Sequence, residues 1–190
     1  MINLHEPSII GNEWKYLKSC LDRGWVSSSG KFVNTFEKKI AKYTGAKYAI
    51  ACINGTSALQ ISLKIAGVKK GDEVIAPSLT FIAPINAINY NEAKPIFMDV
   101  DRYYTIDINK TVNFISQQTS TITKKNRNRK STITINKKTG RRIVALIVVH
   151  TFGNAVNLDK LVSLCRKKNI VLIEDAAESV GTFYKLGKFK

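Results

Sequence analysis

The stretch Val171-Leu172-Ile173-Glu174-Asp175-Ala176-Ala177-Glu178 joins an apolar run directly to three carboxylates within five positions. A short run that is apolar throughout indicates a strand covered on both faces. Carboxylates at the end of such a strand are costly unless a cation or hydrogen-bond donors meet them. The stretch therefore predicts a buried strand whose end faces a positively charged partner.

The same kind of pattern continues along the chain. Further strands are predicted over 47–52, 73–76, 95–100 and 143–149, and helices over 11–23, 33–43, 54–67, 81–89 and 158–168. Apolar strands that alternate with amphipathic helices are typical of a mostly parallel sheet flanked by helices. The predicted fold class is therefore α/β, with three layers.

The formal net charge of +16 is concentrated in one polar segment. Nine of the thirty Lys and Arg residues lie between Thr119 and Arg142, where the chain has no acidic residue. Because no aromatic residue is interleaved for base stacking, we expect a solvated insertion or hairpin rather than a nucleic-acid arm. Attraction of phosphate-bearing substrates or anionic surfaces stays open.

Three cysteines, Cys20, Cys52 and Cys165, lie far apart and form no C-x-x-C pair. Scattered thiols in odd number are typical of a reduced, cytoplasmic protein. The first residues lack the layout of a signal peptide, and no apolar run approaches the length of a membrane span. We expect a cytoplasmic protein without a membrane partner.

Ligands of a parallel sheet bind where its strands lead into helices. At Asn54-Gly55-Thr56-Ser57 a helix begins with two hydroxyl residues, and its free N–H groups and positive dipole end suit a phosphate. A plain helix cap explains the same residues. The sequence has no G-x-G-x-x-G and no G-x-x-x-x-G-K-[ST] motif, so it supports neither a dinucleotide site nor a P-loop.

Two further junctions carry residues suited to a planar cofactor. Phe81 follows the strand at 73–76, where its ring could stack on a flat ligand or pack in the core. Asp175 ends the last strand, where it could hold a protonated pyridine nitrogen. A divalent metal is the competing partner for these carboxylates, but without a P-loop we expect no metal site.

Taken in order, these junctions resemble those of the DegT/DnrJ/StrS-type sugar aminotransferases, pyridoxal-phosphate (PLP) enzymes of fold type I. Each matching stretch is a weak signal alone, whereas the ordered set is specific. The stretches are Gly24-Trp25-Val26-Ser27-Ser28-Ser29-Gly30, Asn54-Gly55-Thr56-Ser57-Ala58-Leu59, Gly71-Asp72-Glu73-Val74-Ile75, Thr80-Phe81, His150-Thr151-Phe152-Gly153-Asn154 and Glu174-Asp175-Ala176-Ala177-Glu178-Ser179.

The resemblance implies cofactor-binding roles for residues at all three junctions. Gly55, Thr56 and Ser57 would bind the phosphate of PLP. Phe81 would stack on the pyridine ring, and Asp175 would pair with the pyridine nitrogen, where it keeps the ring an electron sink.

Other matching residues are implied to lie on the substrate side. Glu178 would approach the ring hydroxyl or the substrate, although many relatives have Gln at its position. Trp25, Ser28 and Ser29 would lie near the sugar nucleotide. His150 is interpreted as a satisfied strand-end histidine and is given no catalytic role.

A subgroup is also indicated by resemblance. The long basic segment before Ile143 and the stretch from Val149 to Leu158 resemble the legionaminic-acid branch of the family. Those enzymes transfer an amino group, usually from glutamate, to the 4-keto carbon of a UDP-linked deoxy sugar. The resemblance therefore implies such a sugar as substrate, glutamate as amino donor and a homodimer at full length.

Transamination needs a lysine that forms a Schiff base with the cofactor. In the family this lysine follows the Asp175 motif after a further strand and a Ser-rich turn, which would place it beyond Lys190. We expect Lys185, Lys188 and Lys190 to be solvated loop lysines, so that no catalytic residue lies within the chain. We therefore expect a fragment, with an N-terminal helix and substrate-side segment at 1–30 and an incomplete PLP-binding domain at 31–190. We also expect a basic insertion at about 119–142 and no C-terminal small domain within these residues.

Several functions stay open from the sequence. The preferred one is an aminotransferase for a 4-keto nucleotide sugar, present as a fragment. The alternative is a catalytically inactive PLP-fold binding or interaction protein, and a basic nucleic-acid binder ranks well below both. Dehydration at the 3-position of the sugar is a further PLP reaction that the sequence leaves open.

Overall fold

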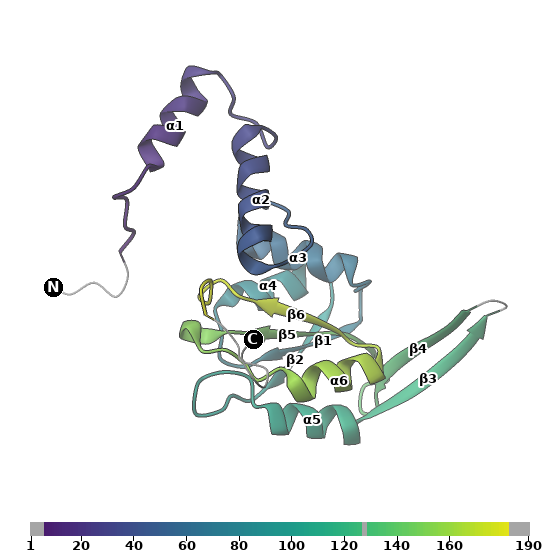
Figure 1. Ribbon diagram of the computed structural model, residues 1–190. Coiled ribbons are helices and arrows are strands. Elements are labelled where there is room, and N and C mark those ends of the chain that lie inside the picture. The colour runs from purple at the N-terminus through teal and green to yellow at the C-terminus, as the bar shows by residue number, and fades with distance from the viewer. Residues whose placement is uncertain (1–5, 127–128, 183–190) are drawn as a thin grey trace. The chain divides into compact units, whose positions relative to one another are not determined.

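The computed structural model describes residues 6–126 and 129–182 (Figure 1). The chain divides into two compact units, Met1–Ala51 and Cys52–Lys190. The division into an N-terminal helix with a substrate-side segment at 1–30 and an incomplete PLP-binding domain at 31–190 stays a prediction.

The described part of the first unit, from residue 6 on, contains two helices, α1 (Glu13–Asp22) and α2 (Lys31–Thr44). The α2 helix ends at Gly45, whose φ of 72° is the left-handed conformation that glycine adopts at helix ends. The ring of Tyr16 on α1 meets that of Phe32 on α2 edge to face, with 5.2 Å between centroids. Neither helix has a buried residue. The two helices confirm those predicted over 11–23 and 33–43. Their apolar side chains are not buried within this unit.

The strand predicted over 47–52 is wrong. The structure assigns no strand there, and the side chains of Tyr48 and Ile50 are 73% and 79% exposed. An apolar run becomes a strand only when a neighbouring strand pairs with its backbone groups. None of the described strands pairs with this segment.

Four parallel strands form the centre of the second unit. They are β1 (Glu73–Pro77), β2 (Lys94–Met98), β5 (Arg142–Val149) and β6 (Val171–Asp175). They lie in the order β2-β1-β5-β6, with the last residues of β5 and β6 paired as Val149 and Asp175. Their carboxyl ends therefore meet at one edge of the sheet.

Two pairs of helices cover the two faces of this sheet (Figure 1). One pair is α3 (Gly55–Ile65) and α4 (Ile82–Tyr90), and the other is α5 (Ile108–Gln117) and α6 (Asp159–Lys168). Successive residues of β5 alternate between two apolar cores: Ala145 and Ile147 belong to that of α3 and α4, and Leu146 to that of α5 and α6. The three-layer α/β fold with a mostly parallel sheet is thus confirmed.

The basic segment forms an antiparallel hairpin of β3 (Thr119–Asn126) and β4 (Arg129–Asn136). It joins the sheet at the start of β5, through the pairing of β4 with Arg142 and Ile143. Asn169, just after α6, donates from Nδ2 to the carbonyl of Thr132 at 2.6 Å. The hairpin therefore lies at the end of β5 opposite to the carboxyl edge. Among the described helices, none is long and apolar enough to cross a membrane.

Candidate active site

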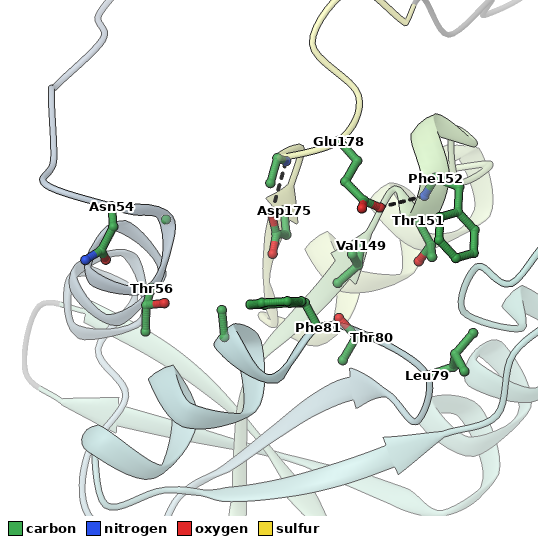
Figure 2. Close-up of a pocket in the computed structure, with 13 residues that line it drawn as sticks. Asn54, Thr56, Leu79, Thr80, Phe81, Val149, Thr151, Phe152, Asp175 and Glu178 are labelled. Carbon is green, nitrogen blue, oxygen red and sulfur yellow. Dashed lines mark hydrogen bonds between the residues drawn. The ribbon is translucent and has the colours of Figure 1, made fainter. Parts of the chain in front are cut away.

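The carboxyl ends of β1, β5 and β6 and the first turn of α3 surround a pocket of about 650 Å³ (Figure 2). This volume lies in the range of small-molecule sites, roughly 300–1,000 Å³. Four junctions of the second unit contribute to its walls. The lining residues are Asn54, Gly55, Thr56, Leu79, Thr80, Phe81, Ala83, Val149, Thr151, Phe152, Asp175, Ala177 and Glu178.

One end of the pocket is the N-terminus of α3. Asn54 caps this helix, because its Oδ1 accepts from the backbone N–H of Ser57 at 2.8 Å. The N–H groups of Gly55 and Thr56 have no partner within the helix, as at every helix start. A Cβ placed on Gly55 would meet nothing within 4 Å, so the space beside the helix end is open. Gly55 and Thr56 therefore fit a phosphate, whereas Ser57 does not line the pocket and its N–H is already bound.

The middle of the pocket holds Phe81 and Asp175 (Figure 2). Phe81 is the N-cap residue of α4 and is 79% exposed, so it is not the core phenylalanine that the sequence left open. Asp175 is the last residue of β6, and its Oδ1 accepts from the N–H of Ala177 at 3.1 Å. No cation pairs with Asp175 in the described part of the chain. A flat, protonated pyridine ring suits this combination of a free aromatic face and an unpaired carboxylate.

The far end of the pocket is built around Phe152, opposite to α3 (Figure 2). Its backbone N–H donates to Oε2 of Glu178 at 2.7 Å. Phe152 has a φ of 54°, which is rare for a side chain of this size. Its ring meets that of Tyr104 edge to face, with 6.0 Å between centroids. The Glu178 carboxylate thus fixes the backbone of Phe152 in the pocket wall and also lines the pocket itself.

Two buried hydroxyl groups in the pocket walls have no hydrogen-bond partner among the described residues. They belong to Thr80, after β1, and Thr151, after β5. An unpaired buried hydroxyl costs roughly 1–3 kcal/mol, so such groups usually have a ligand or water as partner. The sequence did not single out either threonine, although both lie within stretches that carried the family resemblance.

His150 supports the strand ends without entering the pocket. It is 7% exposed, and its Nδ1 accepts from the N–H of Val156 at 3.1 Å. Nδ1 therefore carries no proton in this arrangement, and Nε2–H donates to Oε2 of Glu174 at 3.1 Å. The histidine is fully satisfied, and Glu174 points to it instead of to the pocket.

The predicted substrate-side residues belong to the first unit. Trp25 and Ser29 line a hollow of about 300 Å³ within that unit, where Trp25 Nε1 donates to the Ser29 carbonyl, and Ser28 precedes Ser29 in the chain. Lys185, Lys188 and Lys190 lie outside the described residues. Within the described ranges, no three His, Cys, Asp or Glu residues form a group that could hold a metal ion.

Comparison with known proteins gives a consistent result. The model of the DegT/DnrJ/EryC1/StrS aminotransferase family matches residues 7–189. GDP-perosamine synthase of Caulobacter vibrioides is 37% identical over 97% of this chain and 43% of its own length. The dTDP-3-amino-3,6-dideoxy-alpha-D-galactopyranose transaminase of Aneurinibacillus thermoaerophilus is 34% identical over 86% of the chain and 39% of its own length.

Solved structures agree on the fold. A DegT/DnrJ/EryC1/StrS aminotransferase from Brucella abortus superposes with a TM-score of 0.74 at 29% identity, over 88% of this chain and 40% of that one. The chain thus spans about two fifths of the length of the relatives that it matches. Pyridoxal 5'-phosphate is the cofactor of these aminotransferases.

Proposed function

The chain belongs to the DegT/DnrJ/EryC1/StrS aminotransferase family, and from this premise we propose that it is the cofactor-binding part of an aminotransferase acting on a 4-keto nucleotide sugar. The observation that supports the proposal most strongly is one pocket that joins the start of α3, Phe81 and Asp175. In a pyridoxal cofactor the start of α3 suits the phosphate, Phe81 the pyridine ring and Asp175 the ring nitrogen.

Each of these residues has a distinct task in the proposed site. The N–H groups of Gly55 and Thr56 hold the phosphate, with the positive end of the α3 dipole behind them. Phe81 stacks on the pyridine ring, and the Asp175 carboxylate keeps a proton on the ring nitrogen. When bound, PLP supplies an electron sink that lets an amino group leave the donor and reach the keto carbon.

The substrates are proposed from the family. The sugar carbonyl becomes an amine, and glutamate, the proposed donor, becomes 2-oxoglutarate, so that oxygen and amino group exchange places. The relatives act on sugars of more than one nucleotide, and UDP is the proposed carrier here. The full-length enzyme is proposed to be a homodimer.

A lysine that moves a proton at the reacting carbon is needed for this reaction. None of the described residues that line the pocket is a lysine. We place this lysine outside the described residues, and expect residues 1–190 alone to bind PLP without transferring an amino group.

Binding of PLP to the 190-residue chain tests the proposed site. We expect Asp175→Ala to weaken PLP binding at least tenfold, because a charge-assisted hydrogen bond is worth about 1.5–3 kcal/mol. Asp159→Ala, on the first turn of α6, is the matched control and should bind PLP as the unchanged chain does. Equilibrium dialysis measures the affinities, and equal binding by the unchanged chain and Asp175→Ala contradicts the proposal.

A second measurement concerns the lysine. After borohydride reduction with one equivalent of PLP, peptide mass mapping should find no lysine of the described residues that is labelled preferentially, because exposed lysines react with PLP without selectivity. Preferential labelling of one described lysine that is lost in Asp175→Ala would overturn the placement of the catalytic lysine outside the described residues.

A catalytically inactive binding protein is the second candidate, supported by the lack of a lysine among the described lining residues. The two candidates differ in the coding sequence after Lys190. A continuation with a Ser-rich turn and a lysine supports the enzyme, and its absence supports the binding protein.

A further inference from the structure

Basic residues gather at the amino edge of the parallel sheet, where its strands begin. The pocket lies at the opposite edge, and Asp175 and Glu178, its charged lining residues in the described part of the chain, are both acidic. The second unit therefore has a basic end that lies away from the pocket. It consists of the adjoining hairpin β3–β4, of Lys137, Lys138 and Arg141 just before β5, and of Arg166, Lys167 and Lys168 in the last turn of α6.

The β3–β4 hairpin extends this basic end. It joins the sheet at the start of β5 and projects from it (Figure 1). The chain has no acidic residue between Thr119 and Arg142, and the register of the hairpin places Lys125 directly opposite Lys130. Like charges at opposite positions of a strand pair destabilise that pair. An anionic partner would offset this repulsion.

Most bases that flank the hairpin have no acidic partner among the described residues. The guanidinium of Arg141 lies 3.9 Å from the carboxylate of Glu73. Lys138, Arg166 and Lys167 are exposed and form an ion pair with none of the described carboxylates. Charges without a partner inside the molecule attract anions from outside it. The basic end is therefore available to an anionic surface.

An apolar pair lies beside these charges. Ile122 and Ile133 are directly opposite each other on the hairpin, and neither belongs to the two apolar cores of the second unit. Ile122 is 47% exposed, and Ile133 is half-buried. Exposed aliphatic residues next to Lys and Arg are typical of surfaces that enter the headgroup region of a bilayer. A single-stranded nucleic acid would instead require aromatic faces for stacking, and residues 119–142 contain no aromatic residue.

We propose that the basic end of the second unit docks on an anionic lipid bilayer, with Ile122 and Ile133 in the headgroup region and the surrounding bases on lipid phosphates. Because the pocket lies at the other end of β5, docking leaves it on the side away from the bilayer. This inference goes beyond the proposed function and does not depend on it. It revises the expectation of no membrane partner, which rested on the lack of a spanning segment.

Cosedimentation of the 190-residue chain with lipid vesicles tests the docking. The probes are vesicles of phosphatidylcholine with about 30% phosphatidylglycerol, and vesicles of phosphatidylcholine alone. At about 0.05 M salt the chain should bind the anionic vesicles at least tenfold more tightly than the neutral ones. Binding should weaken as salt is added, because salt screens the attraction between the bases and the lipid phosphates.

Two triple variants separate the hairpin from net charge. Replacing Lys124, Lys125 and Lys130 together by Gln should weaken binding to the anionic vesicles roughly a hundredfold, because each base near such a surface contributes about fivefold. The matched control replaces Lys38, Lys39 and Lys42, exposed residues of α2 in the first unit, by Gln. It removes the same net charge and should weaken binding less than about threefold.

A third variant tests the apolar pair. Thr is β-branched like Ile and already fills neighbouring positions of both strands, so that Ile122→Thr combined with Ile133→Thr should retain the hairpin. This variant should weaken binding to the anionic vesicles about three- to tenfold, because less apolar surface leaves water. Its binding to random-sequence duplex DNA should equal that of the unchanged chain, since the charges are the same.

Several results would overturn the proposal. They are equal binding to anionic and neutral vesicles, no binding to either, equal losses in the two lysine triples, and unchanged vesicle binding in the isoleucine variant. Tighter binding to duplex DNA than to anionic vesicles, at equal phosphate concentration, would assign the basic end to nucleic acid instead.

Discussion

At the scale of single residues, burial sets how reactive the thiols of the second unit are. Cys165 on α6 is 2% exposed and packs in the core that α5 and α6 share with the sheet. Cys52 is exposed. Burial raises the pKa of the Cys165 thiol from 9.0 to about 11, because the apolar core disfavours the thiolate.

This pKa shift predicts a loss of stability at alkaline pH. The folded chain holds the Cys165 proton more tightly than the unfolded chain, so the free energy of unfolding is unaffected well below pH 9. Between pH 9 and 11 only the unfolded thiol ionises, and stability should fall, by about 2 kcal/mol at pH 10.5. Urea unfolding at pH 8 and 10.5 measures this fall.

Two variants isolate the contribution of the buried thiol from other groups that titrate in this range. Cys165→Ala should lack that part of the pH dependence, whatever its stability at pH 8. Cys52→Ala should keep it. Identical pH dependence in all three chains would contradict the assignment.

At the scale of elements, one half-buried ion pair joins the start of β5 to the loop before β1. The guanidinium of Arg142 donates to Asp72 through Nε at 3.0 Å and through Nη2 at 2.5 Å, and Nη2 also donates to the carbonyl of Gly67. Asp72 raises the pKa of Arg142 above its usual value. The planar guanidinium of Arg142 thus contacts three acceptor atoms at once, and the ammonium group of a lysine cannot reproduce this geometry.

We expect Arg142→Lys to lower the free energy of unfolding by about 1–2 kcal/mol, because the two-pronged contact with Asp72 is lost. Lys70, whose pair with Glu92 is mostly exposed, supplies the control. Lys70→Met should change stability by less than about 0.5 kcal/mol. Urea unfolding at pH 7 compares the two, and a loss in Lys70→Met as large as in Arg142→Lys would refute this reading of the pair.

One helix of the structure, α5, was not found from the sequence pattern. The α5 helix was not predicted, because Ile108, Thr111, Val112 and Ile115 are β-branched residues, which have low helix propensity, although its apolar residues do recur at helical spacing. Asp107 nevertheless caps it, accepting from the N–H of Lys110 at 2.9 Å, and Ile115 is fully buried. Burial against the sheet outweighs the weak propensity of this segment.

At the scale of the whole second unit, the basic hairpin and the pocket lie at opposite ends of β5. Arg142 begins β5 beside the basic hairpin, and Val149 ends it at the pocket. Seven strand steps place these residues roughly 23 Å apart. Because the Debye length is about 8 Å at physiological ionic strength, the hairpin charges have little influence at the pocket.

We therefore expect that replacing the hairpin tip, residues 124–131, by a two-residue turn leaves PLP affinity within about twofold at 0.15 M salt. The matched control replaces the basic residues of this tip by Gln in the full-length hairpin. Equilibrium dialysis with PLP measures both. A fall in affinity that disappears at high salt would show that the hairpin charge does reach the site.

The sequence by itself determined the alternation of strands and helices in the second unit, because burial on one or two faces leaves a period in the chain. It also indicated Gly55, Phe81 and Asp175, because strand ends and helix starts carry recognisable residue types. The tertiary structure alone decided that 47–52 forms no strand and that Glu178 accepts a hydrogen bond from the backbone N–H of Phe152. These outcomes depend on strand pairing and hydrogen bonds between segments far apart in the chain, which no local pattern records.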